Sequence, residues 1–176
     1  MEAANGQDPG AGALLASHTS PELARRLQWN LSRLDGYVGV NNHMGSKLTQ
    51  DSAAMEVVMA QLKRRGLLFL DSRTARGTLA ASTARTMGVT TLERDVFLDN
   101  VITSEAIRAQ LRKTEEAARR KGYAIAIGHP HAATIDTLAQ WAAGIEARGF
   151  RLVPLSALTL PGASAKRTVL LPHRGG

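Results

Sequence analysis

Short apolar runs alternate with longer amphipathic segments along most of this chain of 176 residues. The amphipathic segments repeat apolar residues at the spacing of one helix face, as in Leu23, Leu27 and Leu31. The short runs, such as residues 67–70, are continuously apolar, as expected for parallel strands that are buried on both faces. Alternation of the two patterns predicts an α/β fold with a parallel sheet of about five strands.

Capping and turn residues set the bounds of these elements. Ser20 and Pro21 begin the first helix, and glycines such as Gly66 and Gly122 follow the ends of later helices. The predicted helices cover residues 21–34, 51–65, 79–87, 104–121 and 134–148, and Thr134 is the expected cap of the last one. The predicted strands cover residues 37–40, 67–70, 89–92, 123–127 and 150–153.

The same periodicity predicts which side chains face the core. Leu34 continues the inner face of the first helix, and Ile135 begins the inner face of the last helix. Trp29 and Trp141 both lie on predicted helices, where we expect large aromatic side chains to pack in the core. No aromatic residue is therefore nominated as a platform for stacking a sugar ring.

Length and composition are those of one globular domain. Hydrophobic residues make up 44% of the chain, and 176 residues allow a sizeable core. We expect residues 1–159 to form this domain and the Pro/Gly/basic segment 160–176 to be a disordered tail. The chain as written has no apolar run of about 18 residues and no N-terminal signal peptide, so we expect no transmembrane segment.

The net charge of +7 raises the question of a nucleic-acid partner. The basic residues cluster at helix C-terminal ends, as in residues 63–65 and 119–121, where they complement the helix dipole. Aromatic residues are not interleaved with them, as a platform for single strands would require. We therefore expect no nucleic-acid partner, and an anionic envelope polymer or membrane surface suits diffuse positive charge better.

Polar side chains directly follow three apolar runs, at the edge where the ends of parallel strands converge. In residues 39–46, His43 offers an imidazole ligand for a divalent metal. Asn41 and Asn42 would support that ligand or contact a sugar hydroxyl, and Ser46 lies in the same run. The alternative is a tight polar loop in which these side chains cap the backbone.

The second polar group follows the clearest predicted strand. His129 comes after Gly128, which permits close approach of a ligand, and Pro130 stiffens the loop. His129 is therefore a candidate metal ligand and proton donor. His131 is either a second ligand or an exposed residue at the start of the next helix.

The third group follows residues 67–70, and a carboxylate there needs a partner. Asp71 would be a metal ligand, a general base or an orienting group, or else would pair with Arg73 to fix the loop. Ser72 lacks the surroundings of a nucleophile. Asp99 follows a fourth apolar run in the same manner, although with Asn100 it could also cap the next helix.

Four motifs in this order, Asn-Asn-His-Met-Gly-Ser, Phe-Leu-Asp-Ser-Arg-Thr, Phe-Leu-Asp-Asn and Ile-Gly-His-Pro-His, resemble the divergent polysaccharide deacetylase family of bacteria. The resemblance runs from about Pro9 to about Ser156. It implies an irregular (β/α) barrel and metal-dependent removal of acyl groups from a carbohydrate polymer of the envelope or periplasm. About five strands, where such a barrel has about eight, predict a partial barrel whose open edge favours a homodimer.

With the resemblance, the candidate residues take roles. The cofactor is expected to be a divalent metal, zinc by preference. The expected metal ligands are His43, His129 and Asp71; the expected catalytic residues are Asp71, Arg73 and His129; and the expected substrate-binding residues are Asn41, Asn42, Ser46, Ser72 and Asp99.

The chain also departs from the superfamily pattern. Lys47 stands four residues after His43, where better-known members have a second histidine, and the early Asp-Asp strand is absent. We expect the domain to be N-terminally incomplete, with Met1 an internal methionine of the family's sequence. A non-catalytic carbohydrate-binding or envelope-interaction module is therefore the alternative function.

Overall fold

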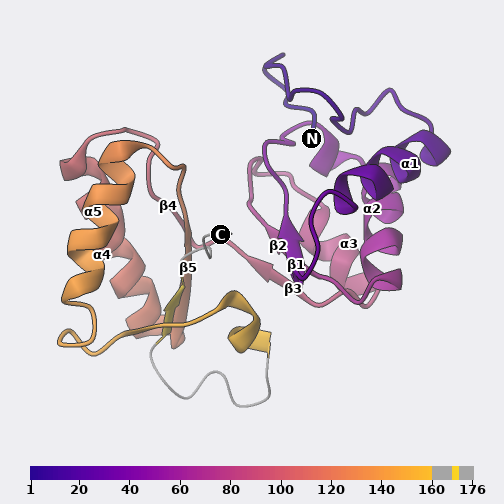
Figure 1. Ribbon diagram of the computed structural model, residues 1–176. Coiled ribbons are helices and arrows are strands. Elements are labelled where there is room, and N and C mark those ends of the chain that lie inside the picture. The colour runs from indigo at the N-terminus through magenta and orange to yellow at the C-terminus, as the bar shows by residue number, and fades with distance from the viewer. Residues whose placement is uncertain (160–167, 171–176) are drawn as a thin grey trace. The chain divides into compact units, whose positions relative to one another are not determined.

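The computed structural model describes residues 1–159 and 168–170. The chain forms two compact units, residues 1–93 and 94–176, and each is described by itself (Figure 1). Both units are α/β with parallel strands, which confirms the predicted fold class. The expectation of one domain over residues 1–159, and of a partial barrel, stays a prediction.

The first unit contains a three-stranded parallel sheet in the order β1-β2-β3, with its three α-helices on one side of the strands (Figure 1). The central strand β2 is buried along its whole length, as its continuous apolar run predicted. The elements are α1 (Ser20–Leu31), β1 (Gly39–Asn41), the 3-10 helix η1 (Leu48–Gln50), α2 (Ser52–Arg64), β2 (Leu68–Asp71), α3 (Ala80–Thr86) and β3 (Thr91–Glu93).

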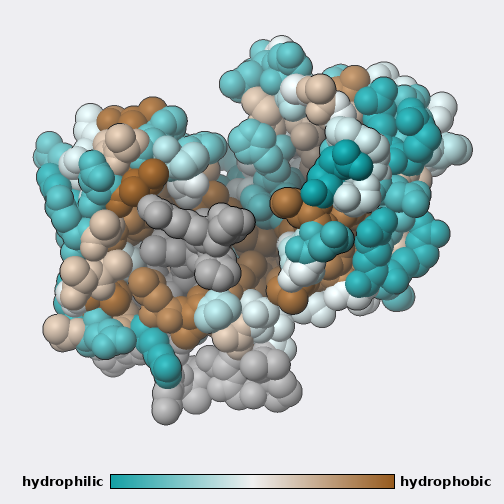
Figure 2. Space-filling model, viewed as in Figure 1, coloured by the Kyte–Doolittle hydropathy of each residue, from teal (hydrophilic) through white to brown (hydrophobic). Residues whose placement is uncertain are grey.

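One hydrophobic core joins the helices and the sheet of the first unit. Met55, Met59 and Leu62 of α2 are fully buried at helical spacing and share this core with Phe69 of β2. The surface over these helices is mostly hydrophilic on the face that Figure 2 shows. Their polar residues therefore face solvent, as the amphipathic pattern predicted.

The second unit contains a four-stranded parallel sheet in the order β4-β5-β7-β6, with α4 and α5 on one side (Figure 1). Strand β7 lies inside the predicted tail, and the rest of residues 160–176 falls outside the described residues. The elements are β4 (Val96–Phe97), α4 (Ser104–Lys121), β5 (Tyr123–Ile127), α5 (Ala132–Ala143), β6 (Arg151–Leu152), the 3-10 helix η2 (Leu155–Thr159) and β7 (Thr168–Leu170).

A buried carboxylate ties the helices of the second unit together. The Glu115 side chain on α4 is only 10% exposed. Its Oε1 accepts hydrogen bonds from Trp141 Nε1 at 2.8 Å and Arg148 Nε at 3.0 Å, and its Oε2 accepts one from Arg119 at 3.3 Å. A carboxylate removed from water requires such donors, so this network fixes α5 and the segment after it on α4.

Two expectations about helix 1 are wrong. The helix ends at Leu31 rather than residue 34, so Leu34 leaves the inner face and is 74% exposed. Trp29 is 50% exposed, and the Arg33 guanidinium lies over its ring at 4.8 Å from the centroid. A flexible cationic side chain thus covers this indole where we had expected core.

The start of helix 5 also differs from the prediction. The helix begins at Ala132, so His131 occupies the cap position, and the Thr134 side chain is buried inside the first turn. Ile135, expected to face inward, is 37% exposed. The helix turns this face inward because the Thr134 hydroxyl has a buried hydrogen-bond acceptor, described below.

Within residues 1–159 and 168–170, no helix is both long and apolar enough to cross a membrane.

Candidate functional site

Asn42 clamps two loops at the edge where β1 and β2 end. The side chain is 2% exposed, and its Oδ1 accepts a hydrogen bond from the Ser72 backbone N–H at 2.8 Å. Its Nδ2 donates to the Met44 carbonyl at 2.9 Å and lies 3.5 Å from Thr74 Oγ1. Asn42 thus holds the loop after β1 against the loop after β2. These contacts favour a positioning role for Asn42, and its contact with substrate stays a prediction.

Each clamped loop contains a residue in the left-handed region of backbone space. Met44 has φ of 56° and Arg73 has φ of 50°, and Gly45 beside Met44 has φ of 95°. Residues other than glycine rarely adopt this conformation, which costs on the order of 1 kcal/mol or more each. The hydrogen bonds of Asn42 help to hold these strained turns in place.

We expect Asn42→Ala to lower the free energy of unfolding by about 2 kcal/mol, since it removes the side-chain oxygen that accepts from the buried Ser72 N–H. Urea denaturation measures this change. Asn41→Ala is the matched control, because Asn41 is exposed and its Nδ2 donates to Ser72 Oγ at 3.0 Å. Equal effects of the two substitutions would contradict the clamp.

Asp71 is fully buried at the end of β2 and accepts hydrogen bonds from the following loop and from the first turn of α3. Its Oδ1 accepts from the Arg73 N–H at 2.7 Å, and its Oδ2 accepts from Thr78 Oγ1 at 3.1 Å and from the Ala81 N–H at 3.3 Å. The carboxylate therefore connects β2 to the start of α3. These contacts favour the loop-fixing alternative, and a catalytic or metal-binding role for Asp71 stays a prediction.

The Arg73 side chain is half-exposed at the same edge, and its Nε lies 3.9 Å from Glu93 Oε2. Glu93, the last residue of β3, also forms a close ion pair with Arg85. The two cations thus share the Glu93 carboxylate. The contact between Asp71 and Arg73 is made by the Arg73 backbone N–H, and the charge pair of their side chains stays a prediction.

The N-terminal segment packs against the loop that contains His43 and Ser46. The His43 carbonyl accepts a hydrogen bond from the Met1 ammonium at 3.1 Å, and Ser46 Oγ accepts one from the Ala4 N–H at 2.9 Å. Burial lowers the pKa of the Met1 ammonium below its ordinary value. The His43 residue itself is exposed. Contact between Ser46 and substrate stays a prediction, since the Ser46 hydroxyl is engaged by Ala4.

Glu2 anchors the same segment. Its carboxylate accepts hydrogen bonds from Lys47 Nζ and the Ala16 N–H, both at 2.6 Å, and these contacts hold the pKa of Glu2 below its ordinary value. Lys47, which stands where better-known superfamily members have a histidine, is thereby an ion-pair partner of Glu2.

The second unit brings Asp99 and His129 together. The Asp99 side chain is fully buried between β4 and α4, and its Oδ2 accepts a hydrogen bond from the His129 N–H at 2.5 Å. Its Oδ1 lies 3.2 Å from His129 Nδ1, and the imidazole is 42% exposed. Phe97 meets the same ring edge-on, with centroids 5.4 Å apart. The carboxylate and Phe97 thus fix both the position and the tilt of the imidazole.

Thr134 completes this arrangement and was not identified from the sequence as part of a site. Its Oγ1 donates to Asp99 Oδ2 at 3.0 Å, which gives the buried carboxylate a third donor. Gly128 leaves room for this arrangement, since a Cβ there would lie 3.2 Å from both Asp99 Oδ2 and Thr134 Cγ2, tighter than most Cβ contacts. A threonine at the start of a helix has the same local signature whether it caps the helix or orients a carboxylate.

His131 lies beside this pair. Ligand atoms of Asp99, His129 and His131 all fall within 4.8 Å of one another, and the two imidazole centroids are 5.7 Å apart. When Nδ1–H of His129 donates to Asp99, the lone pair of this ring lies on Nε2. The cluster can therefore transfer a proton or bind a borderline divalent metal.

Comparison with known proteins identifies the family of the chain. The model of the divergent polysaccharide deacetylases matches residues 1–159. The chain belongs to the divergent polysaccharide deacetylase family. A crystal structure of an uncharacterized protein from Agrobacterium tumefaciens C58, ATU2773, is similar at a TM-score of 0.85 and 31% identity, over 87% of this chain and 62% of that one.

Two curated relatives are also similar in sequence. The uncharacterized protein YibQ of Escherichia coli (strain K12) is 43% identical over 122 residues, or 69% of this chain and 38% of YibQ. An uncharacterized protein of Haemophilus influenzae is 42% identical over 101 residues, or 57% of this chain and 36% of that protein. The family member described here thus spans little more than a third of these relatives' length.

The structure sorts the predicted site residues into two groups. The first unit contains Asn41, Asn42, His43, Ser46, Asp71, Ser72 and Arg73, and the second contains Asp99, His129 and His131. Joint binding of one metal by His43 and His129 stays a prediction.

Proposed function

We propose that this protein is a metal-dependent hydrolase that removes acyl groups from a carbohydrate polymer of the cell envelope. The cluster of Asp99, His129 and His131 supports the proposal most directly, because it joins a proton-transferring imidazole to an orienting carboxylate. Membership of the deacetylase family supports the carbohydrate substrate. The positive net charge of +7 suits an anionic envelope surface.

The donor set of the cluster fits a divalent metal such as zinc. Imidazole nitrogens and a carboxylate oxygen are the ligands that catalytic zinc uses. His129 and His131 would supply nitrogen ligands, and Asp99 would be the carboxylate ligand or, through Nδ1, the group that orients His129. A bound metal would polarise the acyl carbonyl and make bound water more acidic.

The chain's own residues would orient the His129 imidazole and transfer the proton. Asp99 holds the His129 imidazole in one tautomer, with the lone pair on Nε2. This nitrogen would either bind the metal or, if Asp99 and His131 hold the metal without it, accept a proton from water and pass it to a leaving amine or alcohol. The backbone N–H of His129 and the Thr134 hydroxyl keep the Asp99 carboxylate in place. By resemblance to the family we retain Asp71 and Arg73 as further candidates for catalysis.

A carbohydrate-binding module without catalysis is the second candidate. It is favoured by Asp71, the proposed base, whose two carboxylate oxygens each already accept hydrogen bonds from its own loop. In that case the edge residues Asn41, Ser72 and Arg73 would bind sugar hydroxyls with no metal. Sugar binding that survives a chelator, together with absence of hydrolysis, would distinguish this function.

Metal content of the purified protein tests the hydrolase. We expect about one zinc per chain, as catalytic zinc sites bind one ion, and its loss in His129→Ala and His131→Ala. His18→Ala is the control, because His18 Nδ1 accepts a hydrogen bond from the Leu15 N–H in the first unit. Loss of zinc also in His43→Ala would support the ligand set of His43, Asp71 and His129. Zinc retained in all variants would contradict metal binding by Asp99, His129 and His131.

A further inference from the structure

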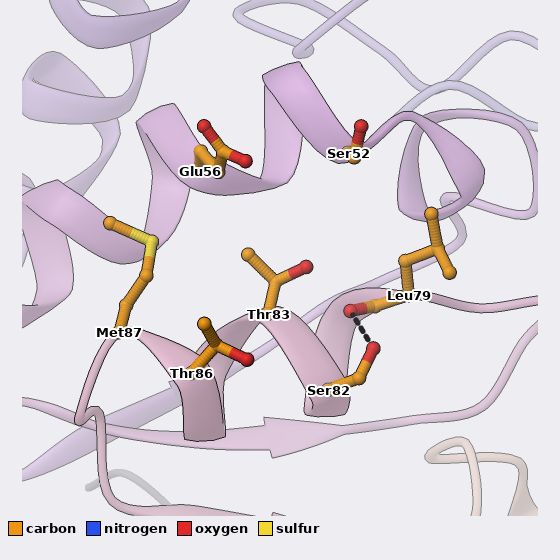
Figure 3. A pocket seen from close by; sticks show the side chains of 7 residues that line it. All are labelled: Ser52, Glu56, Leu79, Ser82, Thr83, Thr86 and Met87. Carbon is orange, nitrogen blue, oxygen red and sulfur yellow. Dashed lines mark hydrogen bonds between the residues drawn. The ribbon is translucent and has the colours of Figure 1, made fainter.

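The first unit contains a largely buried titratable side chain that the candidate site does not use. This residue is His18, just before α1, whose side chain is only 10% exposed. By contrast, the hollow of about 430 Å³ between α2 and α3 is lined mostly by exposed residues such as Glu56, whose charge water can solvate (Figure 3). A change of charge on His18 must instead be accommodated by the protein around it.

The backbone fixes the hydrogen-bonding role of each imidazole nitrogen of His18. Nδ1 accepts a hydrogen bond from the Leu15 N–H at 3.1 Å, and the His18 N–H donates to the Leu15 carbonyl at 3.1 Å, which closes a tight turn. Since Nδ1 is the acceptor, the proton of the neutral ring must lie on Nε2. Nε2 is 3.9 Å from Oε1 of Glu22, in the first turn of α1.

Protonation of His18 is incompatible with this turn. An imidazolium carries a hydrogen on both nitrogens, so Nδ1–H would point at the Leu15 N–H, and two donors would face each other at hydrogen-bond distance. Histidine side chains ordinarily take up this proton between pH 5 and 8. The added proton and the Leu15 hydrogen bond exclude one another, so the turn loses stability as the pH falls.

Two carboxylates, each already paired with a cation, face His18 and favour its charged form. They are Glu2 with its partner Lys47, and Glu22 with its partners Arg25 and Arg26. Glu22 remains beside His18 when the turn opens, because only four positions separate the two residues at the start of α1. Its charge therefore stabilises the imidazolium in the opened turn as well, and protonation does not require the helix to unfold.

Glu2 couples this turn to the loop that follows β1. The Glu2 N–H donates to the Leu14 carbonyl at 2.9 Å, and the Ala16 N–H donates to the Glu2 carboxylate at 2.6 Å. The Glu2 carbonyl in turn accepts from the backbone N–H groups of Lys47 at 3.1 Å and Leu48 at 3.3 Å. Opening of the turn should therefore loosen the loop after β1 as well.

From this geometry we propose that His18 is a pH-sensitive latch, whose protonation opens the turn at residues 15–18 and loosens the hold of Glu2 on the loop after β1. The change is local, because Leu14 is buried in the hydrophobic core and Asn30 Nδ2 donates to the Gly12 carbonyl at 2.9 Å. Residues 43–46 belong to the loop that is loosened. Acidification thus makes one edge of the candidate site more mobile, whether or not the protein is a hydrolase.

Amide hydrogen exchange at about pH 7.5 and about pH 5 tests the latch. After correction for intrinsic exchange rates, we expect the amides of Leu15, Ala16 and Leu48 to lose protection by about tenfold or more at the lower pH, since opening takes up one proton. The amide of Met59, inside α2, should keep its protection and so show that the unit stays folded. Nitrogen chemical shifts of His18 should place the proton on Nε2 at the higher pH.

His18→Asn is the matched variant, because its side-chain oxygen can replace Nδ1 as an acceptor and does not titrate. It should keep the three amides protected at both pH values, whereas His18→Ala should leave them less protected at both. His43→Asn is the control for the exposed histidine of the loop itself and should retain the native pH dependence.

The pH dependence of protection must vanish in both His18 variants. Its survival in either variant would overturn the latch, as would its absence from the native protein or a native His18 with the proton on Nδ1 at the higher pH. Hydrogen exchange requires no turnover and no metal. Failure of the latch and failure of the proposed hydrolase are therefore separate results.

Discussion

Asp99→Asn is expected to lower the proposed deacetylase activity by about 10²- to 10⁴-fold while the protein remains folded. Asparagine keeps an oxygen to accept from the His129 N–H and Thr134, but its amide group would donate to Nδ1. The imidazole proton would then move to Nε2, which could neither bind a metal nor accept a proton. Turnover of an acetylated oligosaccharide by the zinc-loaded protein measures the loss.

The tautomer itself gives an independent measurement. Nitrogen chemical shifts of His129 should show the proton on Nδ1 in the native protein and on Nε2 in Asp99→Asn. Thr134→Val is the matched control, since it removes one donor to Asp99 and leaves the carboxylate and its contact with Nδ1 in place. If Asp99→Asn retains activity and the native tautomer, Asp99 does not orient His129.

Glu115→Ala is expected to lower the free energy of unfolding by about 2–4 kcal/mol. The substitution leaves Trp141 Nε1 and Arg148 Nε without their acceptor, and it removes the link between α4 and α5. The lower end of the range reflects the partial exposure of Arg148, whose side chain is 37% exposed. Urea denaturation followed by tryptophan fluorescence measures the change.

Glu116→Ala is the comparison on the same helix. Glu116 is exposed, so we expect a change within about 0.5 kcal/mol. The double variant of Glu115→Ala with Trp141→Phe should be less destabilised than the sum of its parts, because the two residues share one hydrogen bond. Additive effects in this double-mutant cycle would show that the contact contributes little.

Local sequence pattern was sufficient where a signal is repeated within one element. Strand β5 combines a buried apolar run with a following glycine-histidine pair, and α4 combines helical spacing with Thr103 at its cap and Gly122 at its end. The sequence of strand β7 contains no such repeated signal. It is three residues long, lies in a segment of turn-forming composition, and depends on pairing with β5 and β6, which are distant in sequence.

The candidate site was predicted in its residue types and less well in its contacts. Asp99 and His129 were identified because each follows an apolar run. Their partner Thr134 was taken for a cap, since a hydroxyl at a helix start fits both roles. Asn42 had the same ambiguity: only the contact with Ser72, 30 residues away, identifies it as a clamp. The prediction that Trp29 packs in the core was wrong for a different reason. Periodicity cannot show that the Arg33 side chain, rather than the core, covers the indole ring.

The Asn42 clamp also has a consequence for local unfolding. One amide side chain joins the loops that follow β1 and β2, so neither loop can open without breaking the same hydrogen bonds. Protection of the Ser72 amide against hydrogen–deuterium exchange and resistance of residues 44–46 to proteolysis should then report a single free energy of opening. The two loops would open and close as one cooperative element, even though some thirty residues of chain separate them.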